Sequence, residues 1–93
     1  MDLLLDVIMI ALDMLTFSKV EEKDIEKNIH HVKQYHWFQN LLEHETYRYL
    51  ITHDSDVRQV IGKIKIKRLD SPFYQEKIEK RLRKKLHKKS EHG

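Results

Sequence analysis

Residues 71–89, SPFYQEKIEKRLRKKLHKK, place an apolar side chain at every fourth position and surround it with cations. Ser71 is a favoured N-cap residue, and Pro72 suits the first helical position because its missing N–H needs no partner there. The pattern therefore predicts a helix over residues 72–88. Its apolar row consists of Tyr74, Ile78, Leu82 and Leu86. A row this narrow is typical of a helix that docks along one seam, against another helix or in a partner's groove. We expect Ile78, Leu82 and Leu86 to form a protein interface.

The rest of this helix is strongly cationic. Its basic residues are Lys77, Lys80, Arg81, Arg83, Lys84, Lys85, Lys88 and Lys89. Residues 63–93 hold 12 of the 18 Lys and Arg but 4 of the 15 Asp and Glu, a net charge of +8, against −5 for residues 1–62. Near the start of the helix, Glu76 and Glu79 each stand four residues before a cation, so ion pairs with Lys80 and Arg83 are expected.

Three interpretations of these cations compete. They can form a solvated surface, neutralise the phosphates of a nucleic acid, or lie on an anionic membrane. The chain has no Asn or Gln beyond Gln75, which argues against base-specific recognition. The thin apolar row argues against a membrane surface as the partner, and we do not expect one.

Residues 1–17 carry apolar side chains around most of a helical circumference. Asp2, Asp6 and Asp13 fall within about 40° of one another at 100° per residue, so they form one narrow polar stripe. These carboxylates argue against both a signal peptide and a membrane span. We expect a helix over residues 2–17 whose apolar surface is too wide for a small domain to bury alone. Leu4, Ile8 and Leu12 are therefore expected to meet a second copy of the chain or another protein.

The middle of the chain predicts helices over residues 20–37 and 40–52. Ser18 and Glu21 fit a capping box that would start the first of them. The apolar stripe shifts by about 130° within this region, so one continuous helix would bury two different faces. The pattern leaves two arrangements open, one continuous helix from Val20 to Thr52 or two helices with a break near Gln39-Asn40.

Residues 56–67 present two periodicities. Val57, Val60, Ile61 and Ile64 match the i, i+3, i+4, i+7 spacing of a helix. Residues 62–67, GKIKIK, alternate as in a strand, so a hairpin around residues 46–69 in an α+β fold is the alternative. We favour the helix, because residues 57–61 do not alternate.

Catalytic and metal-binding motifs are incomplete. His44-Glu45 begins like the zinc-binding HExxH helix, but Arg48 replaces the second histidine. His53-Asp54 resembles the ligand pair of helical HD-type phosphohydrolases, in a chain too short for that fold. Glu26 and His30 stand one turn apart and supply two ligands at most. With no cysteine and no phosphate-binding glycine loop, we expect no catalytic residue, metal or cofactor.

These observations predict an all-α fold, a small helical bundle with a basic C-terminal helical arm. We expect a helical domain over residues 1–70 and a basic helix and tail over residues 71–93. The expected function is that of a non-enzymatic regulatory or adaptor protein, a cytoplasmic homodimer that binds an unidentified protein partner through its helices. The alternative is a nucleic-acid-binding protein whose basic helix makes nonspecific phosphate contacts.

Overall fold

The computed structural model describes residues 19–92, which fold into five α-helices and one 3₁₀ turn. The helices are α2 (Glu22–Val32), α3 (His36–Glu43), α4 (Glu45–His53), α5 (Ser55–Gly62) and α6 (Pro72–His92), with the turn η1 (Ile66–Arg68) before α6. No strand occurs in this part of the chain. The prediction of a small all-α bundle is confirmed, and the α+β alternative is wrong.

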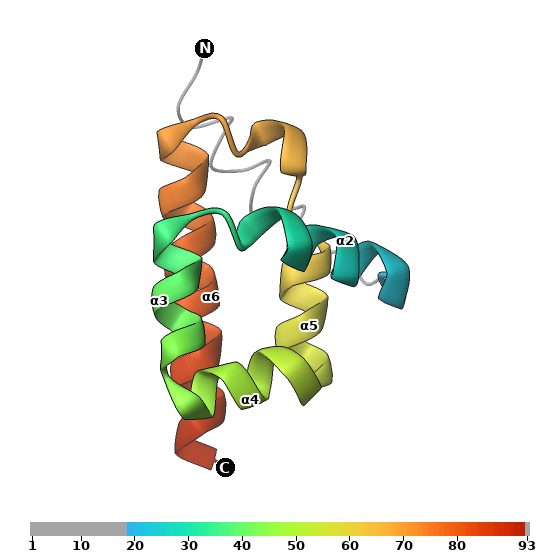
Figure 1. Cartoon of the computed structure of the whole chain (residues 1–93). Helices are drawn as coiled ribbons and strands as arrows, with labels where there is room; N and C mark the ends of the chain where they lie inside the picture. The colour runs from blue at the N-terminus through green and yellow to red at the C-terminus, as the bar shows by residue number, and fades with distance from the viewer. Residues whose placement is uncertain (1–18, 93) are drawn as a thin grey trace.

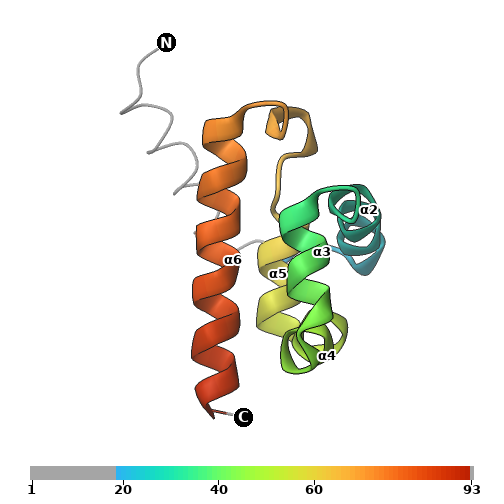
Figure 2. The same cartoon turned by 60° about the vertical axis from the view of Figure 1, so that its left-hand side comes forward.

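The longest helix, α6, runs along one side of the bundle (Figure 1). It packs against α4 and α5, and α2 packs against α5 from the other side. Figure 2 shows α5 between α6 and α2. Helices α2 and α6, which are distant in sequence, thus both pack against the short central helix α5.

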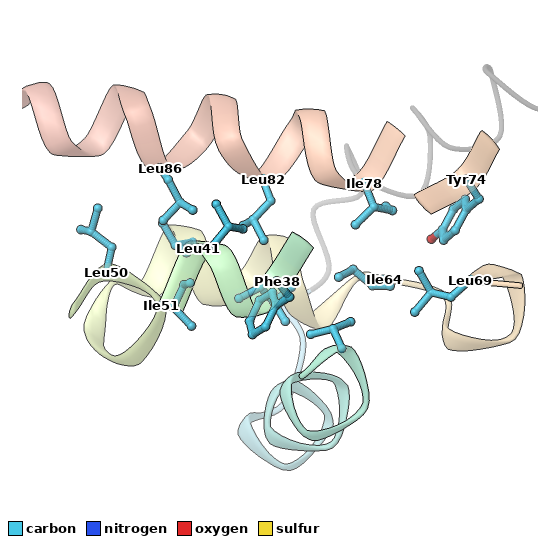
Figure 3. Packing of buried hydrophobic residues seen from close by; sticks show 13 residues of the cluster. Phe38, Leu41, Leu50, Ile51, Ile64, Leu69, Tyr74, Ile78, Leu82 and Leu86 are labelled. Atoms are coloured by element: carbon cyan, nitrogen blue, oxygen red, sulfur yellow. The ribbon is translucent and has the colours of Figure 1, made fainter. Parts of the chain in front are cut away.

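The hydrophobic core includes the apolar row of α6 (Figure 3). The members of the core are Val32, Phe38, Leu41, Leu50, Ile51, Val57, Ile61, Ile64, Leu69, Tyr74, Ile78, Leu82 and Leu86. The core therefore extends past residue 70, and the basic helix is part of the bundle. Burial of each large aliphatic side chain contributes about 1.5–3 kcal/mol.

Residues 20–52 form three helices, with breaks after Val32 and at His44. Neither expected arrangement is right, since Gln39 and Asn40 lie inside α3. At the first break, Tyr35 is extended, and this rotates the chain so that Val32 and Phe38 both reach the core. At the second, the extended His44 starts α4, because its Nδ1 accepts a hydrogen bond from the Tyr47 N–H at 3.4 Å.

The first described helix begins later than the capping-box pattern predicted. Ser18 lies outside the described residues, and Glu21 is the N-cap of α2 instead of its third residue. Val20 pairs with the side chain of Gln59 on α5. Its N–H donates to Oε1 at 2.8 Å, and its carbonyl accepts from Nε2 at 3.0 Å. This pairing takes the Val20 carbonyl, which a helix from residue 20 would use for its first backbone hydrogen bond.

Residues 63–65 are neither helix nor strand, so the predicted helix over residues 56–67 is too long. Buried Asn28 of α2 explains where α5 ends. Its Nδ2 donates to the carbonyls of Ile61, Gly62 and Ile64 at 3.0–3.1 Å, which satisfies acceptors that a helix end leaves open. The hydroxyl of Tyr74 then accepts the Lys65 N–H at 2.8 Å. A side chain from another helix therefore replaces the regular backbone ladder here.

Candidate nucleic-acid interface

Helix α6 divides into a buried and a charged side. Tyr74, Ile78, Leu82 and Leu86 are at most 1% exposed, which holds the helix in one orientation. The eight basic residues predicted as a nucleic-acid contact all lie on this helix. The core therefore fixes which way each of them leaves the helix.

Three of these cations are paired with carboxylates. Lys80 Nζ lies 3.0 Å from Glu76 Oε1, and Arg83 Nε lies 2.7 Å from Glu79 Oε2, which confirms both predicted i,i+4 pairs. Lys89 Nζ reaches Asp56 Oδ2 at 2.6 Å. The sequence did not indicate this last pair, since its partners are 33 residues apart.

The Lys89 contact ties the C-terminal part of α6 to the start of α5. Its ammonium also lies 3.6 Å from Asp54 Oδ2, the N-cap residue of α5. The hydrogen bond from Lys89 lowers the pKa of the Asp56 carboxyl, and the charge of nearby Lys85 lowers it further. The same hydrogen bond raises the pKa of Lys89. Lys89 is therefore paired with two carboxylates of the chain itself.

Four other cations form a cationic stripe, which consists of Lys77, Arg81, Lys84 and Lys88. At 100° per residue they fall within about 60° of one another, and they span about 16 Å of helix. Arg81, Lys84 and Lys88 form no ion pair with the residues that the structure describes. Lys77 Nζ lies 5.5 Å from the centroid of the Phe73 ring. The stripe is thus a row of like charges without carboxylate partners among residues 19–92.

The six residues predicted as a protein interface fall into two groups. Ile78, Leu82 and Leu86 are fully buried against the chain's own helices, so no surface for a partner includes them. Leu4, Ile8 and Leu12 lie outside the described residues. The apolar spacing in α6 had shown which side chains are buried, but not that the chain itself buries them.

The histidine motifs have structural roles in this bundle. His44, from the incomplete HExxH pattern, caps α4 and stacks on Tyr47 with 4.1 Å between ring centroids. Asp54, from the His53-Asp54 pair, caps α5 by accepting the Val57 N–H at 3.0 Å. Within residues 19–92 no three His, Asp or Glu side chains gather closely enough to hold a metal ion.

A concave site, which sequence reasoning missed, lies between α2, α3, α4 and α5. This interhelical cleft has a volume of about 520 Å³. Its walls include Ile29, Leu42 and Ile51 as well as Lys33, Arg48 and Arg58. These residues come from four helices, so no local spacing in the sequence brings them together.

No protein-family model, curated protein or solved structure matches this chain. The fold and its surfaces are therefore the basis for assigning a function. In the described part of the chain, no helix is both long enough and apolar enough to cross a bilayer.

Proposed function

We propose that this protein is a non-enzymatic nucleic-acid-binding protein that contacts the phosphate backbone through the cationic stripe of α6. One observation carries the proposal: four basic side chains share one side of a helix whose orientation is fixed by four buried residues. A nucleic acid supplies the matching row of negative charges, and binding releases its condensed counterions. Such a partner fits the cytoplasmic location expected from the sequence.

The proposed contact is insensitive to base sequence. Lysine ammonium groups are point charges on flexible stems, and they neutralise phosphates without reading base edges. The stripe contains one Arg and no Asn or Gln, the residues that most often bind bases with two hydrogen bonds. Neutralisation of about 4 phosphates gives a slope of log K against log salt near −3.6 for a duplex and −2.8 for a single strand.

The experiment compares two variants of equal net charge. One changes Lys77, Arg81, Lys84 and Lys88 to Gln, and the control changes Lys23, Lys27, Lys65 and Lys67 to Gln. Each is titrated into a labelled duplex and a labelled single strand at 50 and 200 mM salt. We expect the stripe variant to lose most of the affinity and of the salt dependence, while the control keeps both. Equal affinities for the two variants would disprove the assignment to α6.

The second proposed function is that of a regulatory or adaptor protein, which acts through protein contact as a homodimer. It is supported by the spacing of Leu4, Ile8 and Leu12 in the wide apolar surface expected for residues 1–17. Light scattering at high micromolar concentration tests it, with Leu4, Ile8 and Leu12 changed together to Ser as the comparison. We expect a mass of twice 11.4 kDa or more for the wild type. A wild-type monomer would contradict the proposal.

A further inference from the structure

The interhelical cleft combines an apolar base with cations at its edge. Ile51 is buried, whereas Ile29 and Leu42 are half-buried where they line the cleft. The side chains of Lys33 and Arg48 are exposed at its edge. Helices α2, α3 and α4, which contribute them, are seen together in Figure 1. The cleft thus offers an apolar contact and a positive charge within one small volume.

Arg58 is the fixed cation of this cleft. Its side chain is 14% exposed, and its Nη1 donates to the carbonyls of Ile51 and Thr52 at 2.9 and 3.1 Å. Its Nη2 pairs with Glu22. These contacts hold the guanidinium against the end of α4, so its charge stays beside the cleft whether or not a ligand is bound.

The other two cations have no carboxylate partner among the described residues. Lys33 forms no ion pair there, and the guanidinium of Arg48 donates only a weak hydrogen bond there, from Nη1 to the Leu42 carbonyl at 3.5 Å. Glu26 is the one carboxylate among the described residues that line the cleft. Because Glu22 already pairs with Arg58, this single carboxylate stands against the two exposed cations, and an anion in the cleft would balance the remaining positive charge.

We propose that this cleft binds a small anionic amphiphile, an aliphatic chain that carries one carboxylate. The chain would cover Ile29, Leu42 and Ile51, and the carboxylate would lie between Lys33 and Arg48. The cleft volume of about 520 Å³ falls within the range of roughly 300–1,000 Å³ that small-molecule sites occupy. This proposal rests on the cleft alone and is independent of the phosphate contact of α6.

The test uses the full chain and decanoate below its critical micelle concentration, with decyltrimethylammonium as the cation of the same chain length. Two-dimensional ¹H–¹⁵N NMR locates the binding site. We expect decanoate to shift the amide signals around Lys33, Leu42 and Ile51, and the cation to leave them in place. Equal shifts with both probes, or shifts confined to α6, would overturn the proposal.

A matched pair of variants tests the charge. Lys33→Gln with Arg48→Gln removes two cations from the cleft, and Lys80→Gln with Lys84→Gln removes two from α6. We expect the first pair to weaken decanoate binding about tenfold and the second to leave it unchanged, since charge-assisted hydrogen bonds are lost only in the first. An equal loss in both would show that net charge, and not the cleft, attracts the probe.

The length of the aliphatic chain tests the apolar base. Each additional methylene that is buried strengthens binding by up to about fourfold, so decanoate should bind more tightly than octanoate. The same affinity for both would mean that the apolar side chains take no part, and would overturn the proposal.

Discussion

Helices α2 and α6 pack on opposite sides of α5 by different means (Figure 2). Four buried apolar side chains attach α6. On α2, the buried Asn28 stands between Ile25 and Val32 and binds the carbonyls at the end of α5. A close approach at Gly62 supports this contact. A row of apolar side chains stabilises the fold in proportion to the area it buries. A buried polar side chain such as Asn28, which we call the polar anchor of α2, also determines the residue at which the neighbouring helix ends. The two helices therefore differ in which substitutions they tolerate.

A substitution in the apolar row of α6 should lower the stability of the protein most. Leu82→Ala removes a fully buried side chain and leaves a cavity, so we expect the free energy of unfolding to fall by about 3 kcal/mol. Denaturant titration followed by circular dichroism measures it. Lys84→Ala, on the exposed side of the same helix, is the control and should change stability by less than about 0.5 kcal/mol. Similar values for the two variants would show that α6 is not part of the core.

Loss of the polar anchor of α2 should have the second-largest effect on stability. Asn28→Ala leaves the carbonyls of Ile61, Gly62 and Ile64 without their side-chain donor, and we expect a loss of about 2 kcal/mol. Asn40→Ala, at an exposed position of α3, is the matched control. Hydrogen exchange adds a local measurement, because the amides of residues 61–65 should lose protection in the Asn28 variant only. Unchanged protection there would contradict the anchoring role.

The close approach at Gly62 should have a smaller effect. A Cβ at this position would lie 2.8 Å from Cγ1 of both Val20 and Ile25, so Gly62→Ala requires a shift that costs about 1 kcal/mol. Val20→Ala removes Cγ1 of Val20, one of the two clashing carbons. In thermal unfolding, the double variant should therefore be more stable than the sum of the two single changes predicts. Strict additivity would mean that Val20 and the side chain at position 62 are not in steric contact.

The ion pair at the end of α6 should have the smallest effect, and one that depends on pH. Because its pKa is lowered in the folded state, Asp56 contributes stability above the pKa of an unfolded aspartate, near 3.8, and loses it as the pH falls through its folded pKa. Asp56→Asn should therefore be slightly less stable than the wild type at pH 7. The two should converge once the pH has fallen below the folded pKa of Asp56, when thermal midpoints are compared. A constant difference across this range would show that Asp56 does not act through its charge.

The contrast between α2 and α6 also explains what the sequence could predict. The helix expected over residues 72–88 starts where α6 starts, because its four-residue spacing and its Ser-Pro start are local signals. The observed helix continues to His92. The end of α5 depends on Asn28, more than 30 residues away, so no local pattern marks it. His44 as an N-cap was missed because histidine is not among the preferred capping residues.

The candidate sites were predictable to different degrees. The residues of the cationic stripe follow from the sequence, since a single helix brings them together. That the apolar row of α6 meets the chain's own helices, and not those of a partner, requires the tertiary structure. The interhelical cleft combines residues from four helices, and each looks like an ordinary surface or core position in its own helix.

The four-residue spacing of the α6 row has a consequence for the order of folding. Four residues turn an α-helix by about 400°, so the row drifts about 40° at each step, and its two ends face different neighbours. In Figure 3, Tyr74 lies beside Leu69 and Ile64, whereas Leu86 lies near Leu50. The contact at the far end closes a chain segment of more than 30 residues, the kind of non-local pairing that slows folding. During synthesis, this contact between α4 and α6 can therefore form only after Leu86 has left the ribosome.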